Sequence, residues 1–501
     1  RVPKCWLVVV PRGSAAEENI GTPFAASADQ FGVFTSPLSP AVWPNRISIP
    51  LDFNPVDSPC ALGAEELRIA GSELAVPAVA SWQVPLCGRS TLRPFSYAPV
   101  SDSTARQQLS SGLLGGPGMV VVSKPLDPVT VPASNPVVYA PLTASGITIA
   151  FNVERNPNLV ASADEIALAG IRVAQIRLTP RLLAKLLTQS YASAVKIGGG
   201  NPGYGWLASN PSHLGLDPDF LQFNPEFSEL QIANPRSFSG VSFPAGNSDA
   251  IESVWRYVLA DPEARAWLDG APDQWGMKVN PVYNTSLANP SGVPFASPAP
   301  NYFPKSEPYC FQSQAVGLAV KVTPTVLCGT DWLPYTRSMS DSAKVVRTAY
   351  DGARVAINVY AVTPADAWQR EQPQYLGTRS LLAITDTPSA AQYGTQTAML
   401  SRAGDDTGER TFAAPTSAAL GLALDSMQPS TVPEVRQMDF TNQPQGAYPL
   451  AQVSYAAIRP RQISADERRQ FAEFLDYAAA GGQIEGFDPG QLPKGYVPLS
   501  P

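Results

Sequence analysis

Short polar side chains stand directly before predicted helices at three places in this chain. The first is the Gly71–Ser72 turn, the second runs from Ser101 to Thr104, and the third runs from Gly246 to Asp249. The first turn of a helix carries unpaired backbone N–H groups and partial positive charge, so it suits an oxyanion. Glycine lets the backbone approach a ligand closely. This pattern predicts a site for a small polar or anionic solute built from several helix N-termini.

The candidate ligand-binding residues lie at these turns and at the end of one buried strand. They are Ser72, Glu73, Leu74, Ser101, Ser103, Thr104, Lys124, Gly246, Asn247, Ser248 and Asp249. Ser, Asn and Asp are also the residues that ordinarily cap helix N-termini, so capping explains them equally well. Both interpretations are compatible with the sequence.

Catalytic side chains are scarce. His213 is the only histidine, and it lies in a loop punctuated by Pro and Gly, where packing is its expected role. The dense acidic cluster of Asp405, Asp406 and Glu409 is expected to be a solvated turn, because a glycosidase needs two carboxylates facing each other across a cleft. The Gly-Ser turns do not form a G-x-S-x-G nucleophile elbow, and no CxxC pair indicates zinc. We therefore predict a protein that is not an enzyme and uses neither cofactor nor metal.

The chain has five cysteines. Cys310 and Cys328 flank one short segment and are a candidate disulfide, and Cys60 with Cys87 is a second candidate, although Cys5 competes for either pair. The odd cysteine indicates a free thiol or a partner outside this chain. Five reduced, buried thiols in a cytosolic protein are the alternative, but the low content of charged residues favours an oxidising compartment.

Composition points to an exported protein. Charged residues make up 15% of the chain, against roughly 25% in typical soluble domains. The many Ala and Pro residues are typical of exported proteins from high-GC Gram-positive bacteria. The net charge of −7 offers no basic surface to nucleic acid or to an anionic membrane. No apolar run is long enough to span a membrane, so we expect a secreted or cell-surface protein whose export signal and any anchor lie outside this chain.

Two regions differ in their patterns. Residues 1–64 are predicted to be a β segment, because β-branched and aromatic runs at 5–10 and 46–53 are bounded by turn residues. Two strands do not make a stable sheet alone, so this segment either ends an upstream β domain or docks on the rest of the chain. Over residues 65–501, strands such as 118–126 alternate with helices, which predicts α/β lobes with largely parallel sheets.

Residues 270–380 depart from this alternation. They hold many Pro, Asn and Ser residues and predicted strands at 315–322 and 346–350, so we expect a β-rich insertion. Further on, Ser464 followed by Glu467 predicts a capping box at the start of the last helix.

Four stretches resemble the phosphate-binding subunits of bacterial ABC importers. They are LRIAGSELAVPAVASWQ, FSYAPVSDSTARQQLSSG with GMVVVSKPLD, APLTASGITIAFNVE, and GAYPLAQVSYAAI with the last helix and KGYVPLSP. Their order and spacing hold across residues 65–501. The resemblance implies a two-lobed type II periplasmic-binding-protein-like fold, here with a short N-terminal β segment and a β-rich insertion. In that family an anion lies between the lobes on helix N-termini and short hydroxyl groups.

The sequence departs from the family at the residues that would touch phosphate. The family's Thr and Phe at the first turn are Glu73 and Leu74, and its buried Asp is Lys124. At the third turn its Arg is Phe243 and its last Thr is Asp249. The new carboxylates would repel an oxyanion, and the main cation is missing. We expect Lys124 to pair with Glu73 or Asp249, and such a set would suit a zwitterion or polar organic solute better than phosphate.

Two functions follow from this comparison. The first is an exported or cell-surface solute-binding module, associated with an ABC transporter, whose phosphate pocket is degenerate. The second is a structural or adhesive cell-surface protein that has lost its ligand and contacts other surface proteins. Retained binding requires an open cleft with unsatisfied donors, whereas lost binding predicts a cleft closed by its own ion pairs and packing.

Overall fold

The computed structural model describes most of the chain. The described residues are 5–10, 43–51, 60, 65–89, 91–113, 115–132, 134–195, 202–286, 299–304, 310–313, 325–328, 334–352, 355–357, 368–370, 372–405 and 409–499. The chain divides into two units, residues 1–59 and 60–501. The sequence placed this boundary between residues 64 and 65, and the extent of the insertion at 270–380 stays a prediction.

The first unit contains the predicted N-terminal β segment. Strand β1 (Cys5–Val9) pairs antiparallel with β2 (Ile47–Leu51), so that Cys5 lies opposite Leu51. Large apolar side chains of this ribbon are exposed, including Trp6 at 57%. The short helix η1 (Trp43–Asn45) precedes β2.

A seven-stranded sheet organises the second unit. Its order is β14-β6-β20-β5-β3-β4, and β15 also pairs with β6. The strands are β3 (Leu67–Gly71), β4 (Phe95–Pro99), β5 (Met119–Val122), β6 (Val138–Val153), β14 (Ser380–Asp386), β15 (Gln396–Thr397) and β20 (Ala451–Ile458). β3 runs parallel to both β4 and β5, whereas β6 and β20 are antiparallel to their neighbours.

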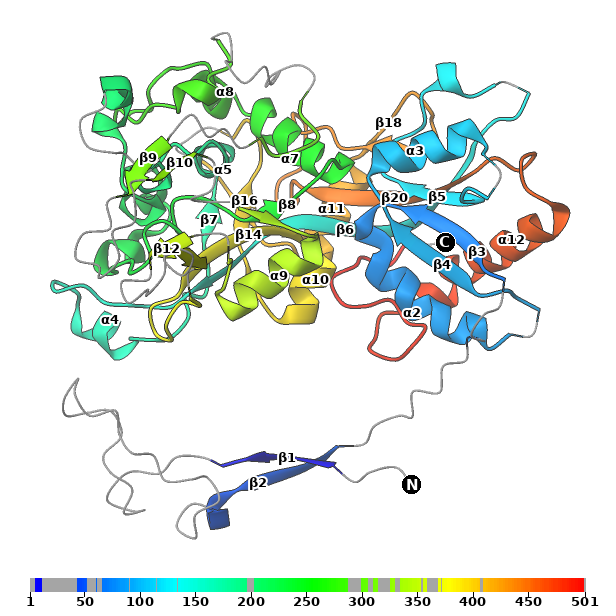
Figure 1. Ribbon diagram of the computed structural model, residues 1–501, viewed down its shortest axis with the longest axis horizontal. Helices are drawn as coiled ribbons and strands as arrows, with labels where there is room; N and C mark the ends of the chain where they lie inside the picture. Colours follow the sequence, from blue (N-terminus) through cyan, green and yellow to red (C-terminus); the bar gives the residue numbers. More distant parts are fainter. Residues whose placement is uncertain are drawn as a thin grey trace. The chain divides into compact units, whose positions relative to one another are not determined.

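The long strand β6 joins two lobes. Its first half, residues 138–146, pairs with β20, and its second half, 147–153, pairs with β14. We call the part built on β3, β4 and β5 lobe 1 and the part built on β14 and the second half of β6 lobe 2 (Figure 1). The predicted two-lobed α/β fold is confirmed, with an N-terminal β segment ahead of the lobes in sequence. The expectation of largely parallel sheets is wrong. In the main sheet of the described residues, β3–β4 and β3–β5 are parallel, whereas β6 pairs antiparallel with β14, β15 and β20, and β20 pairs antiparallel with β5.

Lobe 1 packs three helices on its sheet: α2 (Val76–Cys87), α3 (Asp102–Ser111) and α12 (Ala465–Ala479). Trp82 on α2 meets Phe474 on α12 edge to face, with ring centroids 6.2 Å apart. The predicted capping box is present, because Ser464 and Glu467 cap each other's backbone N–H groups at the start of α12. The two apolar helix faces thus bury a common core against β3 and β4.

Gly71 ends β3 where the first candidate turn begins. Its φ is +149°, and a Cβ atom there would lie 2.0 Å from the carbonyl oxygen of Val121 on β5. Only glycine allows this approach. The short helix η2 (Glu73–Ala75) follows at once and leads into α2.

Lobe 2 carries the larger core. Its main helices are α5 (Pro180–Leu187), α7 (Asp249–Ala260), α8 (Pro262–Leu268), α9 (Met339–Thr348) and α10 (Thr387–Tyr393). On α5, Lys185 is fully buried and pairs with Asp217, Asp219 and Asp273 at 2.8–2.9 Å. These carboxylates compensate the buried ammonium, which would otherwise be very unfavourable.

One predicted strand is a helix. Residues 346–350 were expected to extend as a strand because of their β-branched content, but they include the end of α9. Ser338 caps this helix, and Met339, Ala343 and Val346 line its buried face at helical spacing. Tertiary packing of that face overrides local propensity. The other strand expected in this region, 315–322, lies outside the described residues.

Shorter elements complete the chain. Those before residue 245 are η3 (Pro128–Thr130), α4 (Ala163–Ala167), β7 (Arg177–Leu178), η4 (Ala192–Ala194), η5 (Pro202–Ser209), η6 (Leu214–Leu216), α6 (Pro218–Leu221), η7 (Pro225–Glu229) and β8 (Phe243–Pro244). Those after it are η8 (Pro281–Tyr283), β9 (Cys310–Ser313), β10 (Thr325–Cys328), β11 (Tyr335–Thr336), β12 (Val355–Ile357), β13 (Trp368–Arg370), β16 (Met399–Ser401), β17 (Phe412–Ala413), α11 (Ser417–Asp425), β18 (Gln428–Pro429), β19 (Arg436–Gln437) and η10 (Gly481–Gln483).

The disulfide between Cys60 and Cys87 is confirmed and fixes the start of the second unit to the end of α2. Cys5 is free and exposed. Cys310 and Cys328 are direct backbone partners in the antiparallel pair of β9 and β10, and their disulfide stays a prediction.

Candidate functional site

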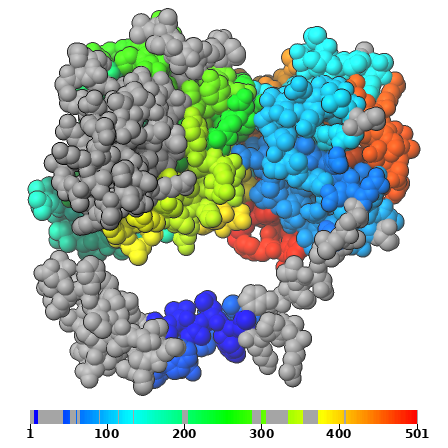
Figure 2. Space-filling model, viewed as in Figure 1, coloured from blue at the N-terminus to red at the C-terminus, as the bar shows by residue number. Residues whose placement is uncertain are grey.

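A cavity of about 1120 Å³ lies between the two lobes. Lobe 1 contributes the first turns of α2 and α3, and lobe 2 contributes the turn before α7 and the first turns of α9 and α10. Residues 486–494 complete the wall. In the space-filling view, the blue lobe 1 and the green and yellow lobe 2 touch, and the red C-terminal segment lies at the lower end of their boundary (Figure 2).

Several helix N-termini meet at this cavity. Ser101 caps α3, Ser248 caps α7 and Ser338 caps α9, each by accepting a backbone N–H bond in the first turn. Asp386 caps α10 in the same way, accepting from the N–H of Ser389 at 2.8 Å. The polar residues before these helices therefore serve as caps and line the cavity at once.

The structure divides the predicted site residues into two groups. Glu73, Ser101, Gly246, Asn247 and Ser248 line the cavity. The remaining ones do not lie on its wall: Ser72, Leu74, Ser103, Thr104, Lys124 and Asp249.

Local packing explains why some of these residues lie away from the cavity. Ser72 is buried, and its carbonyl accepts the hydroxyl of Tyr97 at 2.6 Å. Leu74 is fully buried in the core cluster that also contains Ile147 and Met339. It therefore packs lobe 1 against lobe 2 and contacts no solute.

Two predicted hydroxyl groups belong to a local cap. The Ser101 hydroxyl lies 3.0 Å from that of Ser103 and 2.7 Å from that of Thr104, and it also accepts the Thr104 backbone N–H. Of these three residues, only Ser101 lines the cavity.

The expected partner of Lys124 is wrong. Lys124 lies just beyond the end of β5 and forms an ion pair with Glu252 on α7, whereas Glu73 or Asp249 was expected. Glu252 is one turn further along α7 than Asp249. Asp249 instead pairs with Arg106.

Arg106 and Asp249 link the lobes. The guanidinium of Arg106 on α3 donates to the two carboxylate oxygens of Asp249 on α7 at 2.5 and 3.0 Å. Next to this pair, Oδ2 of Asp102 accepts the backbone N–H of Asp249 at 3.1 Å. Asp102 and Arg106 were not among the predicted residues, although Asp102 lies within the second turn and Arg106 lies on the same helix, α3.

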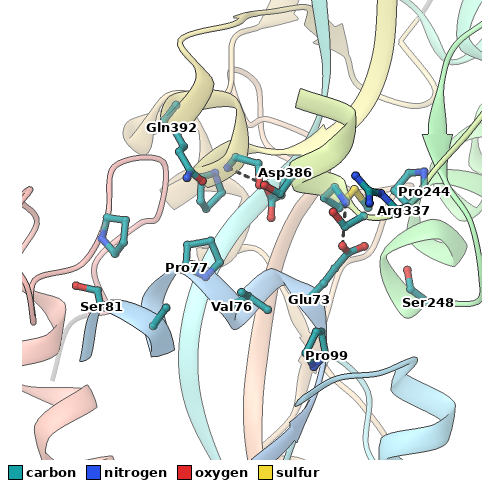
Figure 3. Close-up of a pocket in the computed structure, with 18 of the residues that line it drawn as sticks. Glu73, Val76, Pro77, Ser81, Pro99, Pro244, Ser248, Arg337, Asp386 and Gln392 are labelled. Atoms are coloured by element: carbon teal, nitrogen blue, oxygen red, sulfur yellow. Dashed lines mark hydrogen bonds between the residues drawn. The ribbon is translucent and has the colours of Figure 1, made fainter. Parts of the chain in front are cut away.

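Glu73 makes a second link between the lobes. Its Oε2 atom accepts the backbone N–H of Met339, the first residue of α9, at 2.8 Å (Figure 3). The carboxylate thus takes the place at a helix N-terminus where an anionic ligand could bind. Asp102 does the same at α7 and Asp386 at α10.

These three carboxylates are electrostatically perturbed. Burial raises the pKa of Glu73 to about 7, and the nearby charges of Asp386 and Asp102 add to this effect. Burial and the charge of Asp249 raise the pKa of Asp102 to about 7, although the backbone N–H groups of Asp249 and Ser123 oppose the shift. Burial raises the pKa of Asp386 to about 6.

Two cationic side chains belong to the cavity wall. Arg337 is 88% exposed and pairs with Asp341 at 3.4 Å. The ammonium of Lys494 lies 4.6 Å from the ring centroid of Phe487. Among the described residues, neither cation forms an ion pair within 4.0 Å with Glu73, Asp102 or Asp386.

The remaining sequence candidates lie elsewhere. His213 is buried against Phe238, and burial lowers the pKa of its imidazole to about 4. Asp405 pairs with Arg402 at 2.6 Å, and Asp406 lies outside the described residues. Within the described part of the chain, no group of three or more His, Cys, Asp or Glu side chains could hold a metal ion. In that same part, no helix is both long and apolar enough to cross a bilayer.

No family model and no curated protein matches the chain. Solved structures do match. A phosphate-binding protein from Stenotrophomonas maltophilia is 13% identical, with 87% of this chain and 91% of that chain covered and a TM-score of 0.39. An ABC-type phosphate transport receptor from Vibrio cholerae is 9% identical, with 82% and 94% covered and a TM-score of 0.33.

A third match is the ancestral soluble variant of the human phosphate-binding protein. It is 10% identical, with 87% of this chain and 91% of that chain covered and a TM-score of 0.42. At such low identity, what these proteins bind says nothing about the ligand of this chain.

Proposed function

We propose that this chain is an extracytoplasmic solute-binding module that holds its ligand between two lobes and has lost the phosphate site. The observation that carries this proposal is the placement of three carboxylates at helix N-termini. Glu73, Asp102 and Asp386 each accept a backbone N–H from the first turn of a helix at the cavity. A phosphate would have to displace them, and they repel it when they are ionised.

The cavity itself supports retained binding. Its volume of about 1120 Å³ is slightly above the roughly 300–1,000 Å³ typical of ligand pockets, so a solute has room there. Both lobes and the C-terminal segment contribute to its wall. A solute there would contact residues of both lobes at once.

Location outside the cytoplasm is part of this proposal. The disulfide between Cys60 and Cys87 is the kind of bond that persists in oxidising compartments. The low content of charged residues and the resemblance to importer subunits point the same way. Association with an importer follows from that resemblance alone.

A structural or adhesive module is the second candidate. This second function is favoured by polar contacts in which residues of lobe 1 bind directly to residues of lobe 2. These are Arg106 with Asp249, Lys124 with Glu252, Glu73 with Met339, and Asp102 with Asp249. Such links could hold the lobes together without a ligand.

Thermal unfolding with a panel of solutes separates the two candidates. The panel contains phosphate, sulfate, amino acids, sugars and organic amines at millimolar concentration. A solute present at about 100 times its Kd adds about 2.7 kcal/mol to stability, which raises the melting temperature by a few degrees. We expect a rise with at least one solute and none with phosphate. A rise with phosphate would overturn the loss of that site, and no rise with any solute would favour the structural role.

A further inference from the structure

We propose that the cavity takes an organic cation, attracted by the carboxylates of Glu73, Asp102 and Asp386 on its wall. This inference rests on the proposed solute-binding function and names the chemical class of its ligand. It starts from a difference between these carboxylates and the other buried acids of the second unit.

Buried carboxylates elsewhere in the second unit have basic partners. Those forming an ion pair with Lys or Arg within 4.0 Å are Glu154, Glu165, Asp217, Asp219, Asp249, Asp261 and Asp273. Among the described residues, the buried acids outside this group are Asp102 and Asp386, each 1% exposed. Both line the cavity. The described buried acids without a Lys or Arg within 4.0 Å are therefore gathered at one cavity, where the charge of Arg106 still favours ionised Asp102.

Asp102 adds a separate observation. Its Oδ2 atom accepts the N–H of Asp249, whereas its Oδ1 atom has no hydrogen-bond partner of acceptable geometry in the described part of the structure. The Ser123 amide lies close enough to lower the pKa of this carboxyl. A buried oxygen without a partner is costly, so the Asp102 carboxylate has unused capacity to accept a hydrogen bond.

Glu73 brings the third carboxylate to the same region. It lines the same cavity as Asp102 and Asp386, and the charges of both raise its pKa further. It comes from η2 of lobe 1, whereas Asp386 ends β14 of lobe 2 (Figure 3). An ammonium group has three donors and no acceptor, which suits a site of carboxylate oxygens.

The wall favours an organic cation over a metal ion. The three carboxylates do not belong to any described group that could hold a metal. The rest of the wall includes apolar side chains, among them Val76, Pro77, Pro99, Pro244 and Met339. The carbon chain of an organic cation would pack on these apolar side chains. The proline residues also restrict the backbone of the wall.

The test is calorimetric titration of the chain of residues 1–501. The cationic probes are putrescine, spermidine, choline and arginine. Butanediol is the neutral counterpart of putrescine, and glucose and phosphate represent other classes. We expect at least one cation to bind and butanediol not to bind.

Two amide variants locate the binding. In Asp102→Asn and Asp386→Asn, the side-chain oxygen can still accept the helix N–H, so the fold is retained while the charge is removed. Each should weaken binding of the cation at least tenfold. The matched control is Asp425→Asn, an exposed residue at the end of α11, which should leave the affinity unchanged.

The outcomes separate the two proposals. If glucose or phosphate binds and no cation does, the cation inference is overturned while solute binding stands. If nothing binds, both fail. If a cation binds and both amide variants bind it as tightly as the unaltered chain, the cation binds elsewhere. The proposed assignment of the cation to this cavity is then overturned.

Discussion

Arg106 and Asp249 face each other across the cleft, and both nitrogens of the guanidinium fork donate to the carboxylate. The Asp249 side chain is almost fully buried, so its charge depends on Arg106. The same Asp249 also donates its backbone N–H to Asp102. One residue at the start of α7 is thus bonded to α3 through side chain and backbone.

Replacing Arg106 should loosen this contact. In Arg106→Ala the buried Asp249 carboxylate loses its partner, and breaking a buried pair costs roughly 3 kcal/mol or more. We expect the free energy of unfolding, measured with a denaturant, to fall by that amount. The matched control is Arg469→Ala, whose pair with Asp466 leaves both side chains about half exposed. Such surface pairs contribute less than about 1 kcal/mol, so equal losses in both variants would contradict the assigned role.

Stability should fall as pH rises from about 4.5 to about 7. The folded-state pKa values of Glu73, Asp102 and Asp386 are raised to about 7, 7 and 6. The folded chain therefore binds more protons than the unfolded chain over this range, and its advantage is lost as those protons leave.

The measurement compares the unaltered chain with the triple variant Glu73→Gln, Asp102→Asn and Asp386→Asn at each pH. His213 opposes the trend, since its lowered pKa makes stability rise from about pH 4 to 6.5, but both proteins carry it. We expect the difference in unfolding free energy to grow in favour of the variant with rising pH. A difference that stays constant would show that these carboxyls are not perturbed.

Gly71→Ala should destabilise the chain severely. The new Cβ would lie 2.0 Å from the Val121 carbonyl oxygen, and the φ of +149° is unfavourable for other residues. Strain and overpacking together should cost about 3 kcal/mol or more. Gly421→Ala on α11 is the control, because no atom lies within 4 Å of its added Cβ. Helix propensity predicts a gain of up to about 1 kcal/mol there, and urea unfolding of both variants checks the contrast.

The Cys60–Cys87 disulfide should contribute about 3.5 kcal/mol, since the bonded cysteines are 27 residues apart in sequence. Replacing both cysteines by serine should lower the melting temperature by several degrees. Cys5→Ser is the control, because that thiol is free and exposed. A double variant as stable as the control would mean that the bond does not restrain the unfolded chain.

Peptide mapping under non-reducing conditions should find Cys310 linked to Cys328. Directly opposed residues in an antiparallel pair have Cα atoms about 4.5–5.5 Å apart, within the range that a disulfide spans. Recovery of both as free thiols would exclude this bond in the purified chain.

Much of the fold could be predicted from the sequence, because capping residues and apolar runs indicated the same helices and strands that the packing stabilises. The capping box of Ser464 and Glu467 and the buried strand around Val121 both appear as predicted. Residues 346–350 were misassigned, because β-branched side chains favour strands locally and only the sheet beneath α9 shows which face is buried.

The candidate site was less accessible. The turns could be recognised, so Glu73, Ser101 and Ser248 were found. Asp386 was missed, since it lies far along the chain from Glu73 and Asp102, and the pairing of β14 with β6 brings it to the same cavity. The partner of Lys124 was missed for a related reason. The sequence does not show that Arg106 forms an ion pair with Asp249, so it did not indicate that Lys124 pairs with Glu252.

Strand β20 lies between β5 and β6, although its residues come long after those of either strand in the chain. During synthesis, β3, β4 and β5 must wait for residues 451–458 before their sheet can close, while almost all of lobe 2 has already left the ribosome. The inserted lobe can therefore fold first, and the lobe that begins the unit is the last to be completed. A chain that ends before β20 would leave the edge of β5 without the partner that it has in the folded structure.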